Sequence, residues 1–420
     1  MENRYDKYKD SGIAWIGEIP EHWEVAKIKS FYNVILGKMV ERNNDSNTGD
    51  ENYLCAANIK WNGVDTEINK KMYFSDIEKE KYLLQYNDVL IMEGGMAGTA
   101  CLYKNEFSPC YVQNSVNVCR AKKDFNNKFL YYWMYVPYYN GYIDAICNKA
   151  TIRHYTKEKV QNTPILISSL VEQQSIATYL DQKCGEIDEL ITLQEKMITK
   201  LQSYKQSVIT EAVTKGLDKN VPLKDSGIEW LGEIPEHWTL KRIKNICDNL
   251  DYLREPISAE HRSRNNPIYD YYGASGVIDK IDFYNVDDKV LLIGEDGANL
   301  VMRNLPLVYK ANGKFWVNNH AHILKPKNDN YDFCAYAFEA ADYSLFITGS
   351  AQPKLSQENL GRIKIAIPPF LEQQAIVNYL DKRCSEIDEL ISIKQQKIEK
   401  LKEYKKSLIF ECVTGKRKVS

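Results

Sequence analysis

The sequence predicts an α+β protein in which two similar globular domains accompany a pair of long antiparallel coiled-coil helices, with pseudo-two-fold symmetry. Three observations predict this fold. A long amphipathic segment occurs twice, at residues 172–213 and 372–413, and a short proline-containing motif also occurs twice. Each copy of the short motif is followed by a region rich in β-forming residues that differs strongly between the two halves.

The two long segments have the pattern of paired helices. Neither contains proline, and apolar residues recur every three or four positions while Glu and Lys cover the other positions. At 1.5 Å per residue each helix would be about 60 Å long, so each needs a partner of equal length. The apolar stripes predicted to join the helices are Ile176, Leu180, Ile187, Leu190, Ile191, Ile198 and Leu201 in the first, and Ile376, Leu380, Ile387, Leu390, Ile391, Ile398 and Leu401 in the second.

Composition limits the class of protein. The 420 residues suggest two or three domains, and a hydrophobic content of 44% suffices for ordinary cores. The sequence has neither an apolar run of membrane-spanning length nor a basic-apolar leader, which predicts a cytoplasmic protein with no membrane partner. Its ten cysteines are scattered and are expected to be reduced thiols. The net charge of -2 counts mildly against a polyanionic partner.

The short repeated motif, which we call the clip, begins the chain. Residues 9–29 read KDSGIAWIGEIPEHWEVAKIK and residues 224–244 read KDSGIEWLGEIPEHWTLKRIK, with 15 of 21 positions identical. Its SG and IP pairs interrupt regular structure, while Trp15, Ile19 and Trp23 supply apolar anchors. We therefore expect an extended segment held on a surface, with a packing role.

The globule after each clip is predicted to mix short strands with short helices. Both globules are punctuated by Gly and Asn, and each closes with a strand that leads into its long helix. The order clip, globule, helix occurs twice along the chain. This repetition predicts one body of two equivalent halves with neighbouring chain ends. The predicted segments are 1–168 (first clip and globule), 169–214 (first helix), 215–238 (linker and second clip), 239–368 (second globule), 369–414 (second helix) and 415–420 (tail).

The KDSGIxWxGEIPEHW clip, the EQQxI start of each long helix and the duplicated order resemble the specificity subunits of type I restriction–modification enzymes. This resemblance implies two target-recognition domains, each reading half of a bipartite double-stranded DNA site. It implies that the helices act as a spacer and dock two adenine-methyltransferase subunits, joined by restriction and translocase subunits. S-adenosylmethionine, ATP and Mg are then expected in those partners, and no cofactor is expected in this chain.

Base readout requires polar side chains on exposed loops, with Arg or Lys suited to guanine and Asn or Gln to adenine. For any single residue the alternative is an ordinary polar turn. Candidates in the first globule are Asn58, Lys60, Trp61, Asn62, Glu93, Asn114, Arg153 and His154; those in the second are Tyr272, Ser275, Asp296, Asn318, Asn319, His320, Gln352 and Lys354.

The motifs that could suggest catalysis are incomplete. Residues 265–269 read NNPIY, which lacks the second proline of an amino-methyltransferase motif, and the glycine-rich residues 93–98 lack a following GK[S/T]. Asp296 has no second acid at metal-ligand spacing, and a zinc pair formed by His320 and His322 lacks further ligands nearby. We therefore expect no enzyme within this chain.

Two functions from different classes fit the sequence. The first is a DNA-reading subunit that directs separate methylase and nuclease subunits. The alternative is a non-catalytic, protein-binding coiled-coil scaffold without DNA readout, which the near-neutral charge favours slightly. The duplicated frame with divergent globules favours DNA.

Overall fold

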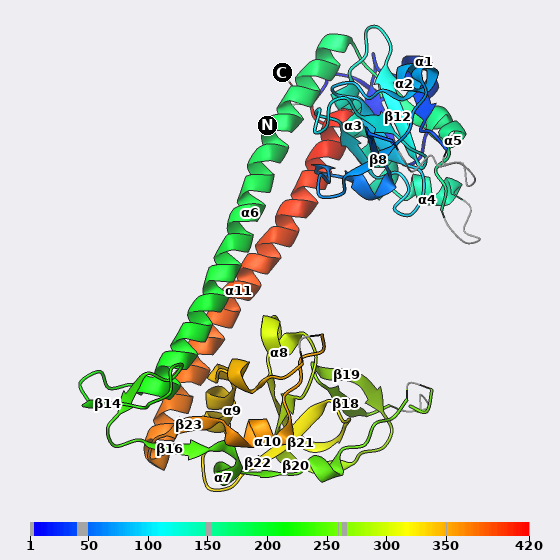
Figure 1. Cartoon of the computed structure of the whole chain (residues 1–420). Coiled ribbons are helices and arrows are strands. Elements are labelled where there is room, and N and C mark those ends of the chain that lie inside the picture. The colour runs from blue at the N-terminus through cyan, green and yellow to red at the C-terminus, as the bar shows by residue number, and fades with distance from the viewer. Residues whose placement is uncertain are drawn as a thin grey trace. The chain divides into compact units, whose positions relative to one another are not determined.

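The computed structural model describes residues 4–39, 49–147, 153–258, 260–262, 267–349 and 351–419. The chain divides into two compact units. Unit 1 comprises Met1–Gln194 and Gln396–Ser420, and unit 2 comprises Glu195–Gln395. Each unit contains one clip, one globule and part of each long helix (Figure 1).

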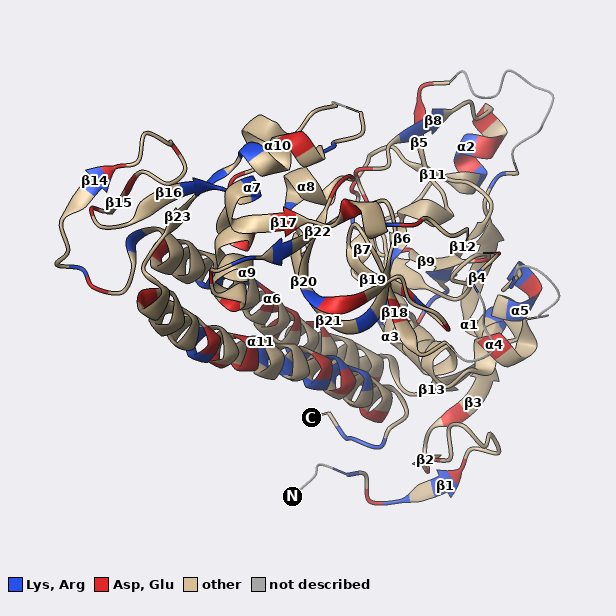
Figure 2. Cartoon of the chain, turned by 90° about the horizontal axis from the view of Figure 1, so that it is seen from below, with Lys and Arg blue, Asp and Glu red and all other residues tan. Residues whose placement is uncertain are grey.

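The long helices are α6 (Leu170–Lys215) and α11 (Phe370–Val413), and within each unit they lie side by side. In unit 1, Lys405 Nζ donates to the Asp188 carboxylate at 2.7 and 2.8 Å. In unit 2, Lys205 Nζ donates to Asp388 at 2.7 Å. These pairings place later residues of α6 beside earlier residues of α11, so the predicted antiparallel arrangement is confirmed. Figure 2 shows acidic and basic residues alternating along both helices.

Most of the predicted apolar stripe is buried or half-buried, but two of its members are not. Leu190 is 43% exposed and Leu390 is 48% exposed. The prediction was wrong for these two leucines. In the first helix, Ile187 and Ile191 already face inward, and Leu190, one residue before Ile191, is rotated by about 100° around the helix axis away from it. The position four residues before Ile198 is instead filled by a polar side chain, Gln194, which is buried.

Each clip is a short antiparallel hairpin, as the extended prediction implied. β1 (Tyr8–Asp10) pairs with β2 (Glu18–Pro20), and β14 (Leu223–Asp225) pairs with β15 (Glu233–Pro235). The tryptophan after each hairpin, Trp23 or Trp238, is fully buried. Burial of so large a side chain explains how a short hairpin is anchored.

The clips cover the ends of the long helices in an equivalent way. Gly216 directly follows α6 and Gly415 lies just beyond α11, with φ of +76° and +70°, the left-handed conformation that favours glycine at a helix end. A Cβ on Gly216 would lie 3.2 Å from Trp238, and one on Gly415 would lie 3.4 Å from Trp23. Clip two is joined covalently to the helix that it covers, whereas clip one meets α11 only through non-covalent contacts. One of these is the hydrogen bond from Tyr8 Oη to the Gly415 carbonyl, at 3.0 Å.

The globule of unit 1 is built on a four-stranded sheet of order β10-β9-β12-β4. Its strands are β4 (Tyr32–Leu36), β9 (Val89–Met92), β10 (Ala100–Leu102) and β12 (Val116–Ala121). Smaller strands are β5 (Glu51–Leu54), β8 (Lys70–Met72) and β11 (Tyr111–Val112) in a second sheet, the pair β6 (Ile59–Lys60) and β7 (Gly63–Val64), and the pair β3 (Glu24–Lys27) and β13 (Pro164–Ile167). The short helices are α1 (Ile28–Phe31), α2 (Asp76–Tyr82), α3 (Asn127–Tyr139), α4 (Tyr142–Ile146), α5 (Lys157–Asn162) and η1 (Ala56–Asn58).

The globule of unit 2 has one six-stranded sheet of order β17-β22-β20-β21-β18-β19. Its strands are β17 (Cys247–Asn249), β18 (Tyr269–Gly273), β19 (Gly276–Ile281), β20 (Val286–Gly294), β21 (Val308–Val317) and β22 (Ala321–Pro326). A separate pair is β16 (Thr239–Arg242) with β23 (Lys364–Ile367). The helices are α7 (Ile243–Ile246), α8 (Asn299–Met302), α9 (Tyr331–Ala340), α10 (Gln357–Arg362), η2 (Asp251–Leu253) and η3 (Ser344–Phe346).

The two globules share a core, which confirms the prediction of one repeated fold. The order β10-β9-β12-β4 in unit 1 matches β21-β20-β22-β17 in unit 2, and both are antiparallel throughout. The strand β9 and residues 290–294 of β20 are buried, as their apolar sequences require. The globules differ at the sheet edges, where unit 2 adds the hairpin β18-β19 and unit 1 has its second sheet.

Candidate nucleic-acid interface

In both units a glutamate follows the central strand and joins two other loops to the end of the sheet. In unit 1 this is Glu93, directly after β9. Its N–H donates to the Ser115 carbonyl at 2.9 Å, and its carbonyl accepts from the N–H of Tyr155 at 2.7 Å. The loops before β12 and before α5 therefore meet the loop after β9 at one place.

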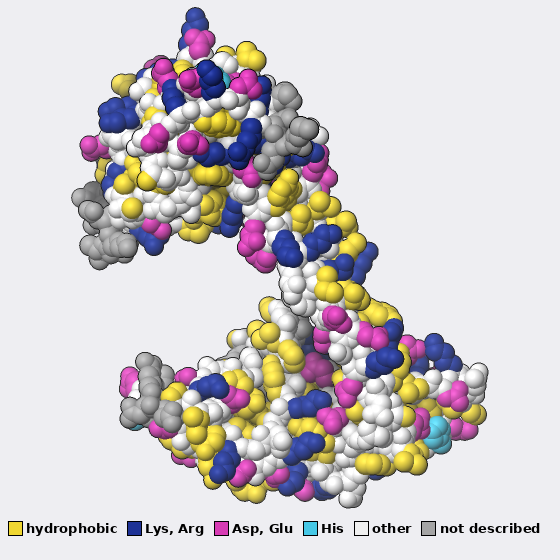
Figure 3. All heavy atoms as spheres, turned by 180° about the vertical axis from the view of Figure 1, so that it is seen from behind, with side chains coloured by type: hydrophobic (Ala, Val, Ile, Leu, Met, Phe, Trp, Pro, Cys, Tyr) yellow, Lys and Arg dark blue, Asp and Glu magenta, His cyan; other side chains and the backbone are white. Residues whose placement is uncertain are grey.

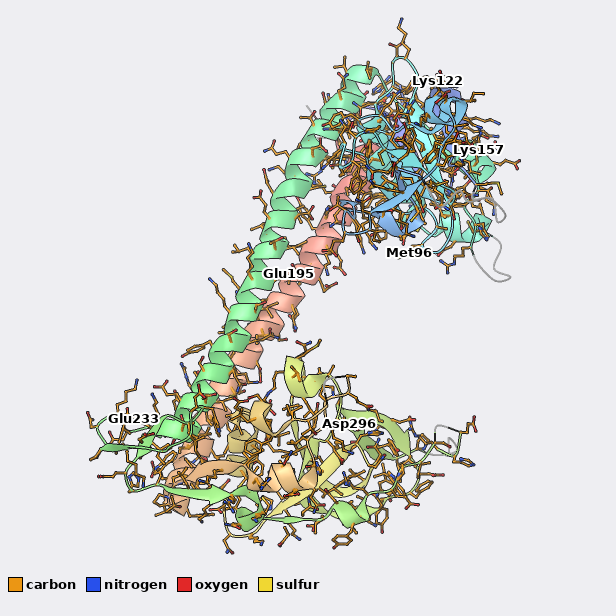
Figure 4. The ribbon with its side chains drawn as sticks, in the orientation of Figure 1. Met96, Lys122, Lys157, Glu195, Glu233 and Asp296 are labelled. Carbon is orange, nitrogen blue, oxygen red and sulfur yellow. The ribbon has the colours of Figure 1, made fainter. Side chains whose placement is uncertain are left out.

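Unit 2 repeats this arrangement. Glu295 follows β20; its N–H donates to the His320 carbonyl at 2.9 Å, and its carbonyl accepts from the N–H of Leu355 at 2.7 Å. Glu93 and Glu295 are thus equivalent, as are Tyr155 and Leu355. In Figure 4, Met96 and Asp296 mark the corresponding loop of each unit. We call the three loops that meet in each unit the three-loop site.

The three-loop site of unit 2 collects all the residues predicted for that globule. Asn318 N–H donates to the Tyr272 carbonyl at 3.1 Å. This bond brings the turn between β18 and β19, which contains Ser275, next to the three loops. His320 Nδ1 lies 2.6 Å from Asp296 Oδ2, and Asp296 forms a β-bridge with Lys354. The members exposed to solvent are Ser275, Asn319, His320, Gln352 and Lys354.

Asn318 is not available to DNA in this structure. Only 5% of the residue is exposed, and its Oδ1 accepts from the His320 N–H at 2.8 Å. Its amide therefore shapes the turn before β22, which corrects the prediction that it reads a base.

Beneath the exposed side chains of unit 2 lies a buried network of charges. His322 is fully buried; its Nδ1 lies 2.6 Å from Asp251 Oδ2 and its Nε2 lies 2.8 Å from the Leu355 carbonyl. Glu295 accepts a hydrogen bond from Arg254, and its Oε1 lies 3.1 Å from Lys354 Nζ. Charges buried in this way are retained when they are paired and hydrogen-bonded.

The network changes the acidity of its carboxylates. Burial acts to raise the pKa of Asp251, but the hydrogen bond and charge of His322, the Ile323 N–H and the charge of Arg254 together hold it below its usual value. Burial likewise acts against ionisation of Glu295, and Arg254, His322 and Lys354 hold its pKa below the usual value. Both side chains are therefore carboxylates at neutral pH, which ties the loop of Lys354 to the sheet.

Most of this network is not predicted from the sequence. Asp251, Arg254 and Glu295 were not among the predicted residues, and His322 was named only as half of an alternative zinc pair with His320, which was itself predicted to contact DNA. Asp251 and Arg254 stand three residues apart in one turn of helix, the spacing of an ion pair, and this was the signal available. The two histidines instead have separate carboxylate partners.

The three-loop site of unit 1 contains Glu93, Asn114 and His154. A Cβ placed on Gly94 would lie 3.9 Å from the His154 ring, so these loops are adjacent. Arg153 is exposed and donates to Asp144 Oδ1 at 2.5 Å, across to α4.

The remaining residues predicted for unit 1 lie around the turn between β6 and β7. Lys60 and Asn62 are exposed there, while Trp61 packs on Tyr135 with ring centroids 4.2 Å apart. Asn58 is fully buried: its Nδ2 donates to the carbonyls of Asp65 and Ile68 at 2.9 and 2.7 Å. The structure therefore corrects the prediction for Asn58, whose amide holds a loop together and is not free to contact a base.

Comparison with known proteins agrees with this duplicated architecture. The family model described as "Type I restriction modification DNA specificity domain" matches twice, at residues 20–203 and 235–403, which together exceed half of the chain. The chain belongs to this family. It is the DNA-recognition component of a type I restriction–modification system.

Individual relatives span nearly the whole chain. The putative type I restriction enzyme MjaX specificity subunit of Methanocaldococcus jannaschii is 26% identical and covers 96% of both chains. The MjaVIII specificity subunit of the same organism is 25% identical, covering 96% of this chain and 94% of its own length. A solved structure from a study of complex assembly and conformational transition of the type I R-M system has a TM-score of 0.70 at 14% identity. It covers 94% of this chain and 98% of its own, and its likeness shows the fold.

The surface of this specificity subunit is mixed in charge. Figure 3 shows Lys and Arg interspersed with Asp and Glu on the face that it presents. None of the helices in the described part of the chain is long and apolar enough to cross a bilayer. Among the described residues, no three His, Cys, Asp or Glu side chains are grouped to hold a metal ion.

Proposed function

We propose that each unit reads one half of a bipartite double-stranded DNA site, and that the three-loop site of each unit supplies base contacts. The observation that carries this proposal is repetition with divergence. The same three loops are joined by the same backbone hydrogen bonds in both units, yet their side chains differ. Ser115, His154 and Tyr155 in unit 1 correspond to His320, Lys354 and Leu355 in unit 2. A fixed backbone with exchangeable side chains suits readout of two different half-sites.

The side chains of these loops have the required chemistry. Gln352 and Asn319 are exposed amides suited to adenine, while Lys354 and Arg153 are exposed cations suited to guanine or to phosphate. Lys157, at the start of α5, is exposed beside the loop of His154 (Figure 4). Because such cations are scattered, phosphate affinity comes from individual lysines and arginines within a surface of mixed charge.

The long helices are proposed to dock two adenine-methyltransferase subunits. Supporting this, apolar and aromatic side chains of the two helices lie exposed at equivalent positions 200 residues apart. Their exposed fractions range from 43% to 53%. Equivalent patches suit two copies of one partner. The pairs are Leu190 with Leu390, Leu193 with Ile393, and Tyr204 with Tyr404.

The subunit itself is proposed to be non-catalytic. Methyl transfer would then use S-adenosylmethionine in the methyltransferase subunits, and cleavage would use ATP and Mg in the restriction and translocase subunits. Rigorously purified chain is expected to transfer no methyl group to DNA without added partner.

A domain exchange tests the bipartite proposal. Residues 24–168 are replaced by the matching region of a relative with a different target, and methylated adenines are mapped across a genome carrying the chimera. One half-site should change while the other is kept. A change in both halves, or in neither, would contradict separate readout. DNA binding by the methylase complex should also weaken steeply as salt rises, because phosphate contacts release counterions.

A further inference from the structure

The equivalent glutamates Glu93 and Glu295 have opposite surroundings. Glu295 is 7% exposed, and its carboxylate is paired with Arg254 and Lys354 and lies 4.0 Å from His322 Nε2. This carboxylate is occupied by its own protein. It has a structural role in unit 2.

The Glu93 carboxylate has no such partners. Its Oε2 is buried and accepts no hydrogen bond, and among the residues that the structure describes no cation forms an ion pair with it. The residue that replaces His322 at the equivalent strand position is Asn117, whose Nδ2 donates to the Tyr155 carbonyl at 3.3 Å. The place of Lys354 is taken by His154, which is exposed and lies beside Gly94.

An unpaired carboxylate at this place is costly to the free protein. Burial raises the pKa of Glu93, with the charges of His154 and Lys159 acting in the opposite direction. A desolvated acceptor without a donor destabilises a fold, so a side chain in this condition at a binding surface is suited to a donor from outside. The side chain is half-buried rather than enclosed, and it sits in a loop whose next residues include the exposed Met96.

The nature of that donor follows from the acceptor. A carboxylate is repelled by the phosphates of the DNA backbone and cannot bind them. At base edges of the major groove it accepts from an exocyclic amino group, which cytosine N4 and adenine N6 provide. We propose that Glu93 is a specificity-determining residue of unit 1, and that it accepts a hydrogen bond from a base amino group in the half-site read by that unit.

This inference rests on the proposed function, since it assumes that unit 1 reads its own half-site. It also assigns different roles to the two equivalent positions. Glu93 contacts DNA, whereas Glu295 stabilises the loops of unit 2.

The test compares Glu93→Ala, Glu93→Gln and Glu295→Ala in the full chain assembled with its methyltransferase. Methylated adenines are mapped on genomic DNA, and thermal unfolding of each purified chain is measured. Glu93→Ala should relax selectivity at one base pair of the unit 1 half-site by about 5-fold to 150-fold, the range for one good base contact. Its Tm should be unchanged or higher. Glu295→Ala should lower the Tm, because it leaves Arg254 and Lys354 without their partner.

Glu93→Gln identifies the base. Glutamine pairs with adenine through two hydrogen bonds. The variant should therefore shift selectivity towards adenine if the wild-type base is cytosine, and keep it if the base is adenine.

An unchanged target sequence for Glu93→Ala would overturn the inference. So would loss of methylation at every site by both Glu93 variants, because removal of one acceptor should relax a single position. A wild-type target that is not bipartite would instead contradict the proposed function. The two failures are therefore distinguishable in one experiment.

Discussion

In the interior of unit 2, His322 Nδ1 lies 2.6 Å from Asp251 Oδ2 while the other ring nitrogen faces the Leu355 carbonyl at 2.8 Å. A carbonyl can only accept, so Nε2 carries a hydrogen. The ring therefore bridges Asp251 and the Leu355 carbonyl, and it joins the sheet to the loop that carries Gln352 and Lys354.

Replacement of this histidine should destabilise unit 2. His322→Leu removes the buried partner of Asp251, and breaking such a pair costs about 3–5 kcal/mol. Faster hydrogen exchange of β20 and β22 amides would measure the effect. His320→Leu is the matched control, since that ring is exposed and its loss should cost much less. Equal protection in the two variants would show that the pair contributes little.

Acid should weaken unit 2 through the same carboxylates. The pKa values of Asp251 and Glu295 are lowered from 3.8 and 4.5. A lowered pKa stabilises the fold above the unfolded value, and that contribution is lost as pH falls through the folded value. The free energy of unfolding of unit 2 should therefore decline below about pH 4.5. The slope should be smaller in His322→Leu, and a decline of this contribution with rising pH would have the wrong sign.

Glu93 should show the opposite dependence in unit 1. Its pKa is raised by burial, so its contribution is most favourable below the unfolded value of 4.5 and is lost as pH rises. Glu93→Gln should therefore unfold at a higher temperature than wild type at neutral pH. The difference should vanish in acid, where the wild-type side chain is protonated. Calorimetry at pH 4 and pH 7 on both proteins would reveal it, and a variant less stable at neutral pH would count against an unpaired carboxylate.

The exposed apolar patches on the helices should be required for methyltransferase binding. Leu193→Asp combined with Ile393→Asp places a charge in both patches, and we expect at least a tenfold loss of affinity, about 1.4 kcal/mol. Thr192→Asp with Ser392→Asp is the matched control. It adds the same charges one residue away, on another exposed side of each helix. Titration calorimetry with the methyltransferase would compare them, and equal affinities would exclude these patches from the interface.

A half-length chain should assemble with itself. Residues 1–217 contain a clip, a globule and one long helix, and the clip covers a helix end non-covalently in the intact protein. Each of two copies can therefore supply the second helix that the other lacks, together with the contact between clip and helix end. Sedimentation should show a dimer, and the methylated site should be a palindrome, because a two-fold dimer reads a symmetric sequence. A folded monomer would contradict the expected exchange.

The repeated frame could be predicted from sequence because its signals are local. The proline-free segments carry a helical apolar repeat in neighbouring residues, and each clip is recognisable from one short run of residues. The place of the candidate loops was predicted for the same reason, since strand ends and turns are recognisable.

Individual roles within those loops could not be predicted. Asn58 and Asn318 resemble exposed loop amides in sequence, and only the folded chain brings carbonyls or an N–H to satisfy them. Glu93 and Glu295 look alike in sequence, yet their difference depends on Arg254 and His322, which reach Glu295 from other strands and turns. The prediction for Leu190 was wrong because two adjacent apolar residues, at 190 and 191, cannot both face the partner helix.

The packing of each clip on the end of a long helix has a consequence for the gene. Each globule is bounded on one side by a clip and on the other by a long helix, and both boundary segments occur twice in similar amino-acid sequence. Recombination within these repeats would exchange a whole globule between the two positions, or between related genes, and would keep a clip and a long helix on either side of it. A lineage can therefore acquire a new DNA target in one genetic event, without repairing any packing surface afterwards.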